Sequence, residues 1–155
     1  MFKDTMTLLE NAVSSRLLPG LETFPCPYVK GAGSNSVVRI VFPEFTCVCP
    51  KTGYPDFASI DLHYVPNKRC IELKSWKLYL NSFRMIGTFH ETVTCHLFTT
   101  VRQLLKPAWI LLAGDFFPRG NVCTTVVFEA GRRPAAADFC VKNYKSHSRT
   151  FGDKS

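Results

Sequence analysis

Residues 108–129 read AWILLAGDFF-PRGN-VCTTVVFE, and this stretch decides the fold class. Two apolar runs rich in valine, leucine and phenylalanine stand on either side of the tetrapeptide PRGN, residues 118–121. Proline, glycine and asparagine between two such runs are typical of a turn that joins antiparallel strands. We therefore predict a β-hairpin here, with strands over 108–117 and 122–129.

Two earlier strands are predicted upstream. The run Val37–Phe42 is apolar, rich in β-branched residues and bounded by Pro43. Over residues 59–64 apolar and polar side chains alternate strictly, which is typical of a strand with one face buried. The segment Cys49–Pro55 between them is dense in turn formers, so we predict that the two strands pair across a long loop.

The middle of the chain changes to a helical period. We predict one helix over Ile71–Met85 and a second over His90–Lys106, which Pro107 ends. The apolar stripes are Leu73, Trp76, Leu80 and Phe83 in the first helix, and Val93, Leu97, Val101 and Leu104 or Leu105 in the second. The predicted order is β-β-α-α-β-β. An antiparallel sheet with both helices on one face is the simplest arrangement that buries the apolar stripes, so the predicted class is α+β.

The chain length and composition predict a single domain. A chain of 155 residues, 46% hydrophobic, can bury one core but not two. We expect a helical arm over 1–20, a catalytic domain over 21–133 and a basic tail over 134–155. No apolar run approaches the roughly 18 residues of a membrane span and no secretion signal precedes the domain, so we expect a cytosolic protein. Open edges of a four-stranded sheet favour covering by further copies of the chain.

The net charge of +7 and the seven cysteines leave several kinds of partner open. The charge suits either nucleic acid or an anionic ligand, although part of it lies in 142–154, which has the composition of a solvated tail. An odd number of cysteines without an export signal indicates reduced thiols. The one close pair, Cys47 and Cys49, lacks the spacing of a zinc site, so we expect no metal.

Cys49 is the candidate nucleophile. It precedes a proline in the turn-rich segment, and Lys51 and Asp56 follow closely. A catalytic thiol needs donors or cations that lower its pKa and a proton donor for the group that it attacks, and Lys51 and Asp56 suit these tasks. A buried, inert thiol and an ordinary turn aspartate remain the alternative interpretation.

Two further polar groups carry a functional and a structural interpretation. His90 and Glu91 open the second helix, where they either cap it or contact a purine-like base whose N–H donors a carboxylate would accept. Lys74 and Lys77 lie three residues apart, so they share a helix face that is either simply solvated or meets a phosphate. No glycine-rich dinucleotide or P-loop motif occurs, which disfavours those nucleotide sites.

Several stretches of the sequence between about 21 and 133, taken in order, resemble one enzyme family. They are Leu21–Pro25, Pro43–Ala58, Glu72–Tyr79, Ser82–Arg84, Phe89–Glu91 and Pro118–Gly120. The family is that of the NADPH-dependent 7-cyano-7-deazaguanine reductases of the queuosine pathway, in their single-module form. The chain departs from the family pattern at Tyr54, where glutamine is usual, and at Cys47, where serine is frequent.

This resemblance implies a fold, a reaction and a set of site residues. The fold would be the tunnelling fold, in which sheets of several subunits close into a barrel with sites between subunits. The Cys49 thiolate would add to the nitrile carbon while Asp56 protonates the nitrogen, and two NADPH molecules would reduce the resulting thioimide to the amine. The other implied residues are His90 for proton transfer, Ile71, Glu72, Leu73, His90 and Glu91 for the deazaguanine, and Lys74, Ser75, Lys77 and Arg119 for the cofactor.

Three other functions compete with this one. An amidinotransferase of archaeosine synthesis resembles the same family and acts on tRNA without NADPH, but the Glu72–Tyr79 segment resembles the cofactor motif and argues against it. A basic RNA-binding module would leave Cys49 and Asp56 without a task. A zinc-dependent pterin enzyme of the same fold would need ligand histidines that the sequence lacks. We therefore expect a small-molecule substrate, a homo-oligomer, and neither a membrane nor direct nucleic-acid binding.

Overall fold

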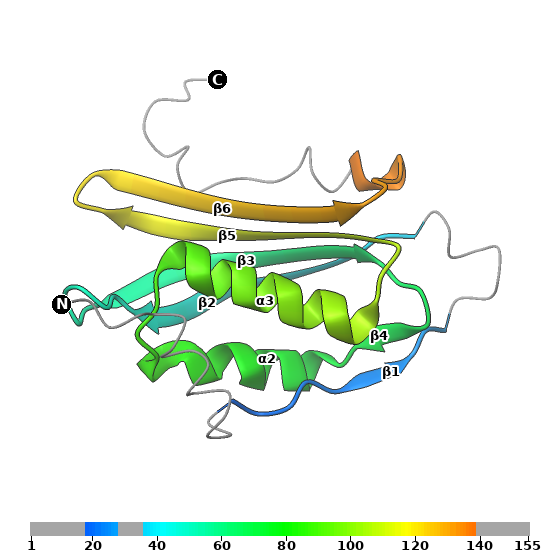
Figure 1. The fold of residues 1–155 in the computed structure, drawn as a ribbon, viewed down its shortest axis with the longest axis horizontal. Helices are drawn as coiled ribbons and strands as arrows, with labels where there is room; N and C mark the ends of the chain where they lie inside the picture. Colours follow the sequence, from blue (N-terminus) through cyan, green and yellow to red (C-terminus); the bar gives the residue numbers. More distant parts are fainter. Residues whose placement is uncertain (1–17, 28–35, 139–155) are drawn as a thin grey trace.

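The computed structural model describes residues 18–27 and 36–138 of the chain. Their central element is a four-stranded antiparallel sheet in the order β2-β3-β5-β6 (Figure 1). Its strands are β2 (Val38–Val48), β3 (Pro55–Val65), β5 (Trp109–Arg119) and β6 (Val122–Gly131). A separate two-stranded sheet pairs β1 (Thr23–Pro25) with β4 (Arg69–Ile71).

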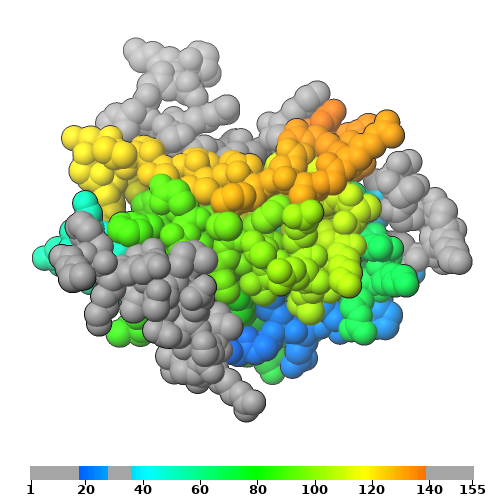
Figure 2. Space-filling model, viewed as in Figure 1, coloured from blue at the N-terminus to red at the C-terminus, as the bar shows by residue number. Residues whose placement is uncertain are grey.

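Two α-helices, α2 (Leu73–Asn81) and α3 (His90–Leu105), lie on the same face of the central sheet (Figure 1). A short 3-10 helix, η2 (Ser82–Met85), joins them. In the space-filling view α3 fills the middle of this face, between β6 above and the region of β1 below (Figure 2). The predicted α+β class and the order of two strands, two helices and two strands are confirmed, with β1 and β4 as additions that the sequence did not indicate.

The core lies between the sheet and the two helices. Its members include aromatic and branched side chains that are almost fully buried: Trp76, Leu80 and Phe83 from α2 and η2, Val93, Leu97, Val101 and Leu105 from α3, and Ile60, Leu62 and Tyr64 from β3. Gly114 on β5 lets α3 approach closely, because a Cβ at that position would lie 2.7 Å from Thr94 Oγ1. The stripe predicted for α3 is thus confirmed as its buried face.

Strand β2 is longer than the sequence predicted, since it does not end at Pro43 but continues to Val48. The pairing with β3 shifts between Phe42 and Phe45, where β2 carries one residue more than its partner. A proline is tolerated there because β2 is an edge strand and the extra residues of a bulge need no ladder hydrogen bond. The predicted long loop is therefore short, and Cys49 follows the strand directly.

The first helix begins later and ends earlier than predicted. Ile71 belongs to β4, and Glu72 is the residue that caps α2, with its side chain accepting hydrogen bonds from the N–H groups of Lys74 (2.9 Å) and Ser75 (2.7 Å). Leu73, predicted to be buried, is 60% exposed. The second helix matches its prediction to within one residue, because Lys106 is its left-handed C-cap with φ 45°.

The predicted half-buried pattern of β3 is wrong, because both of its faces are covered. Asp61 and His63, expected to face solvent, are each 1% exposed. Asp61 accepts hydrogen bonds from Arg39 on β2 and pairs with His63 Nε2 at 2.8 Å, so the buried carboxylate is well satisfied. A second apolar cluster containing Trp109, Leu111 and Ala113 also lies away from the main core.

The predicted hairpin over 108–129 is confirmed as β5 and β6, each slightly longer than expected. Arg119 pairs with Val122, and the two residues between them, Gly120 (φ 55°) and Asn121 (φ 66°), both have positive φ as a type I′ turn requires. Between Phe116 and Arg119 the pairing shifts, because β5 takes three steps where β6 takes two. This β5 bulge places the Arg119 side chain on the same face as Phe116.

Two predicted segments fall largely outside the described residues, namely the helical arm over 1–20 and the tail over 134–155. The domain limits at 21 and 133 therefore stay predictions. Among the helices that the structure describes, none is both long and apolar enough to cross a membrane.

Candidate active site

The loop that carries Cys49 is a tight, backbone-bonded turn between β2 and β3. The Cys49 N–H donates to the Tyr54 carbonyl at 2.8 Å, and the Gly53 N–H donates to the Cys49 carbonyl at 2.8 Å. Gly53 has φ 74°, a conformation that glycine adopts without strain. The position of the thiol is thus set by the backbone, whereas the Tyr54 side chain is 68% exposed.

A second set of backbone hydrogen bonds ties this loop to the start of α3. The Val48 N–H donates to the Ile86 carbonyl, and the Thr88 N–H donates to the Val48 carbonyl, both at 3.0 Å. This short parallel bridge holds the segment before α3 beside the end of β2. It brings His90, the first residue of α3, to the same end of the sheet as Cys49.

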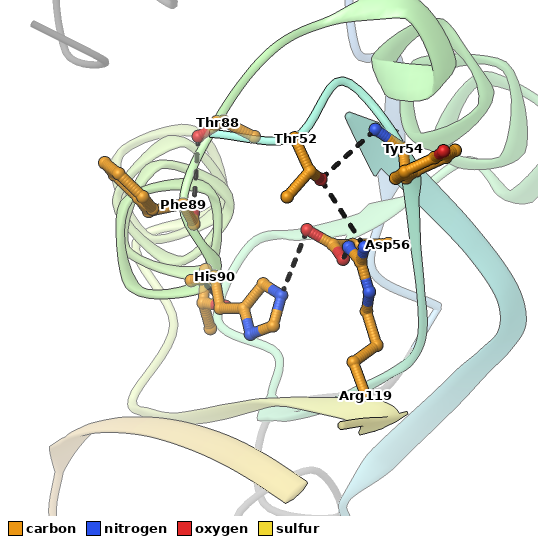
Figure 3. A network of polar contacts seen from close by, with 8 residues as sticks. Thr52, Tyr54, Asp56, Thr88, Phe89, His90 and Arg119 are labelled. Carbon is orange, nitrogen blue, oxygen red and sulfur yellow. Dashed lines mark hydrogen bonds and ion pairs between the residues drawn. The ribbon is translucent and has the colours of Figure 1, made fainter. Parts of the chain in front are cut away.

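Asp56 lies at the centre of the site and is only 3% exposed. Its Oδ1 accepts a hydrogen bond from Arg119 Nη1, and its Oδ2 lies 3.3 Å from His90 Nε2. Figure 3 shows Asp56 between these two side chains, which come from β5 and α3. The His90 ring stacks on Phe116, with centroids 3.7 Å apart and planes 7° apart, so the imidazole is held in place by packing.

Cys49 has the electrostatics of a reactive thiol. Desolvation by burial works against its ionised form, but hydrogen bonds from the Thr52 hydroxyl and from the backbone N–H groups of Thr52 and Lys51 outweigh it and lower the Cys49 pKa. Lys51 thus acts through its backbone. In contrast, burial and the neighbouring Asp56 raise the pKa of Cys47 to about 12. Two thiols one residue apart therefore differ in reactivity.

Thr52 is a site residue that the sequence reasoning missed. Its Oγ1 accepts hydrogen bonds from Arg119 Nη2 at 3.5 Å and from the Tyr54 N–H at 3.3 Å, as Figure 3 shows, and its hydroxyl bonds to Cys49. Its position three residues after the nucleophile was the available signal, because a hydroxyl in a tight turn usually bonds to a neighbouring loop group.

Three of the residues predicted to bind the base, those of the segment 71–73 between β4 and α2, lie at the other end of the sheet from Cys49 (Figure 1). Ile71, Glu72 and Leu73 line a cavity of about 620 Å³ together with residues of β1, β2 and β3, including Phe24 and Arg39. The Glu72 carboxylate caps α2, and hydrogen bonds from the Lys74 and Ser75 N–H groups hold its pKa below the usual range. Glu91 lies at the opposite end, exposed beside His90.

The predicted cofactor residues do not form one group within the chain. Lys74 and Lys77 are exposed on α2, whereas the Ser75 hydroxyl is buried and donates to the Glu72 carbonyl at 2.8 Å. Arg119 lies with Asp56 at the far end of the sheet instead of with these lysines (Figure 1). One chain therefore brings together Cys49, Asp56, His90 and Arg119, and separates them from the segment 71–77.

The side chains around Cys49 can be compared with those that a metal ion needs as ligands. Within residues 18–27 and 36–138, no three side chains of histidine, cysteine, aspartate or glutamate converge as a metal site would require. The polar groups around Cys49 form ion pairs and hydrogen bonds with one another, an arrangement suited to addition of a thiol and transfer of a proton.

Comparison with known proteins shows a family and several relatives that the chain resembles. Residues 55–135 match the model of a family described as QueF-like protein. The chain is 52% identical to the NADPH-dependent 7-cyano-7-deazaguanine reductase of Anaeromyxobacter sp. (strain K) over 115 residues, which are 74% of this chain and 92% of the relative. It is 47% identical to the reductase of the same name from Aquifex aeolicus over 106 residues, 68% of this chain and 80% of the relative.

The fold also has a solved counterpart. The apo crystal structure of the archaeosine synthase QueF-Like superposes with a TM-score of 0.59 at 23% identity and covers 64% of this chain and 97% of that one. At this identity the likeness shows the fold alone. The sequence matches lead to one conclusion, that the chain belongs to the QueF-like protein family.

Proposed function

We propose that this chain reduces the nitrile of 7-cyano-7-deazaguanine to the aminomethyl group with NADPH, a step of queuosine biosynthesis. Relatives that share about half of their residues with this chain, over most of their own length, are named NADPH-dependent 7-cyano-7-deazaguanine reductase. The observation that carries the proposal is the geometry of the site, in which a thiol of lowered pKa lies beside a buried carboxyl group. These are the nucleophile and a carboxyl group that can pass a proton from His90 to the nitrile nitrogen, as addition to a nitrile needs.

The reaction begins at Cys49. Its thiolate forms a bond to the nitrile carbon while a proton reaches the nitrile nitrogen through Asp56, which gives a thioimide. When bound, NADPH supplies hydride, one equivalent to the thioimide carbon and a second to the imine that forms when the thiolate leaves. In total, two hydrides and two protons convert the nitrile to the amine, and the Cys49 thiolate is regenerated.

His90 maintains the proton supply in this scheme. Its Nε2 lies 3.3 Å from Asp56 Oδ2, close enough for a short adjustment to form a hydrogen bond. Stacking on Phe116 fixes the ring, so the imidazole can return a proton to Asp56 after each transfer.

The remaining site residues are proposed to come from a second copy of the chain. Ile71, Glu72 and Leu73 line their cavity at the end of the sheet away from Cys49, so one chain does not place them against the same small base. The exposed Lys74 and Lys77 on α2 suit the phosphates of the cofactor, because they are cations on one accessible helix face. A homo-oligomer with sites between subunits would join these residues to Cys49 and Glu91.

The test mixes the purified protein with 7-cyano-7-deazaguanine and NADPH and follows NADPH absorbance together with the mass of the protein. We expect two NADPH oxidised per nitrile and, without NADPH, a covalent adduct on the wild type that Cys49→Ala lacks. Asp56→Asn, which keeps the shape of the side chain but cannot carry the proton, is expected to form the adduct about a hundredfold more slowly or worse.

A second candidate function is that of an amidinotransferase, because the chain shares its fold with the archaeosine synthase QueF-Like. The same experiment separates the two functions. A Cys49 adduct with no oxidation of NADPH would favour the amidinotransferase, and absence of both signals would exclude nitrile chemistry at this site.

A further inference from the structure

Arg119 is placed among the reacting groups by two features of the β5-β6 hairpin. The type I′ turn at Gly120 and Asn121 follows it directly, and the β5 bulge after Phe116 turns its side chain to the face that carries His90. Arg119 is three residues after Phe116, so in a regular strand without a bulge it would point to the opposite face. The local backbone is thus built to aim this guanidinium at Asp56.

The guanidinium makes two contacts there. Nη1 donates to Asp56 Oδ1, and Nη2 lies 3.5 Å from Thr52 Oγ1 (Figure 3). The ion pair with Asp56 is the largest influence on Arg119 and raises its pKa, and the Cys49 sulfur adds to that effect. Arg119 therefore touches the carboxylate directly, and it reaches the thiol both by its own side-chain interaction with Cys49 and through the Thr52 hydroxyl, which itself bonds to Cys49.

Asp56 would oppose the ionised thiol if it stood alone. Its negative charge raises the pKa of Cys49, and it raises the pKa of Cys47 as well. A guanidinium bonded to the carboxylate neutralises this charge at close range, where screening by water is weak because Asp56 is buried. Removing the cation would leave two negative groups side by side.

The groups that face Cys49 come from every element packed around it. Its own loop contributes the backbone N–H groups of Lys51 and Thr52, β3 contributes Asp56, and β5 contributes Arg119. On β2, Cys47 stays protonated at neutral pH because its pKa is about 12. On α3, His90 lies beside Asp56, with its Nε2 3.3 Å from the Asp56 Oδ2. Among these side chains, Arg119 is the cation bonded to Asp56 that remains charged throughout the range of enzyme activity.

We propose that Arg119 is a positioning residue of the Cys49 thiolate, which acts through Asp56, through Thr52 and through its own contact with the sulfur, and which serves formation of the covalent adduct instead of binding the cofactor phosphate. The inference rests on the proposed function for its substrate, but its first consequence concerns the thiol alone. Loss of the cation shifts ionisation of Cys49 to higher pH. At neutral pH less thiolate is present, so both alkylation and addition to the nitrile slow down.

The first experiment measures the rate of Cys49 carboxamidomethylation by iodoacetamide against pH, in wild type and in Arg119→Gln, by peptide mass spectrometry. We expect the midpoint of the variant to lie higher by about one pH unit, which is about tenfold slower modification at neutral pH. Arg102→Gln is the matched control, because Arg102 is exposed on the last turn of α3, and it should follow the wild-type curve. Identical curves for all three proteins would overturn the proposal.

A second pair of variants tests the path through Thr52 and guards against a folding defect at Arg119. Thr52→Val has nearly the same shape but lacks the hydroxyl, whereas Thr52→Ser keeps it. We expect Thr52→Val to raise the alkylation midpoint and Thr52→Ser to stay near the wild type. Arg119→Lys, which keeps the charge without the forked donors, should fall between wild type and Arg119→Gln. Equal midpoints for the two Thr52 variants would contradict the path.

The third measurement separates the thiol from the cofactor. With 7-cyano-7-deazaguanine and no NADPH, Arg119→Gln should form the adduct about tenfold more slowly at neutral pH and recover as the pH rises. Its KM for NADPH should stay within twofold of the wild type. A wild-type rate of adduct formation with a strongly raised KM would instead make Arg119 a phosphate ligand. Because alkylation needs no nitrile, a shifted alkylation curve would support the role of Arg119 even if the proposed substrate failed.

Discussion

At the scale of the residue, the informative contrast is between Cys47 and Cys49. The sequence singled out Cys49 because a proline and turn formers follow it, but it could not separate the two thiols further. Cys47 is fully buried and directly opposite Asp56 in the β2-β3 ladder, whereas Cys49 lies one residue beyond the strand. The pairing of Cys47 with Asp56 depends on how the two strands align in the folded chain, so the sequence alone could not predict that the two thiols differ in pKa.

This contrast predicts which thiol reacts in the native protein. Brief treatment with iodoacetamide at neutral pH should modify Cys49 and leave Cys47 unmodified, because the Cys49 pKa is lowered and that of Cys47 is about 12. Peptide mass spectrometry reads both sites from one digest. In denaturant both should react. Equal native modification of the two thiols would show that Cys47 is accessible and ionised, against the burial described above.

At the scale of the element, the sequence predicted which segments form strands and helices better than where they end. Pro43 predicts an end of β2 at that position, but a proline costs little on an edge strand inside a bulge. The helical period predicts Glu72 within the first helix, although an acidic side chain before a helical run also suits the N-cap, which is where Glu72 lies. Both errors come from signals whose meaning depends on the neighbouring strand.

The contact of α3 with β5 predicts a packing defect at Gly114. Gly114→Ala would set a Cβ 2.7 Å from Thr94 Oγ1 and should lower the free energy of unfolding by about 1–3 kcal/mol. Urea unfolding measures it. Adding Thr94→Ala should recover part of the loss, so that the double variant is more stable than the sum of the single changes predicts. Gly20→Ala is the control, since nothing lies within 4 Å of its added Cβ.

The link between β2 and β3 predicts a pH-dependent effect at Asp61. Desolvation raises its pKa, but hydrogen bonds from His63 and Arg39 outweigh this and lower it below the ordinary value of 3.8. A carboxyl group of lowered pKa stabilises the fold above its unfolded pKa, and this contribution is lost as the pH falls through the folded pKa. The stability that Asp61 contributes should therefore be full at neutral pH.

Asp61→Asn should accordingly lower the free energy of unfolding by about 2–3 kcal/mol at pH 7, because a buried carboxylate with two basic partners is removed. The difference between wild type and variant should shrink below pH 4. Thermal unfolding at several pH values measures both. An unchanged melting temperature at pH 7 would mean that the buried network contributes nothing net.

At the scale of the whole molecule, the sequence predicted the architecture and most of the residues that gather around Cys49. It could not predict that the segment 71–77 lies at the other end of the sheet, because residues close in the family pattern need not be close within one chain (Figure 1). Strands β2 and β6 form the two edges of the central sheet. Open edges and a divided set of site residues both fit an oligomer with shared sites.

Shared sites predict complementation between inactive variants. Cys49→Ala and the double variant Lys74→Ala, Lys77→Ala should each have little activity alone. If the variants are unfolded in mild denaturant, mixed and refolded together, about a quarter of the sites in a symmetric oligomer would combine an intact thiol with intact lysines. NADPH oxidation measures the recovery. No recovery in mixed oligomers, with subunit exchange shown by tagged chains, would place each site within one chain.

The β5 bulge has a consequence for how this hairpin can change over generations. An insertion of one residue into β6 opposite the bulge, between Val122 and Thr124, would leave a regular, well-paired hairpin and would turn the guanidinium to the opposite face. Such a protein would fold and express normally and yet lose the cation beside its nucleophile. Lineages that keep the reaction should therefore tolerate substitutions in this hairpin far more readily than changes in its length.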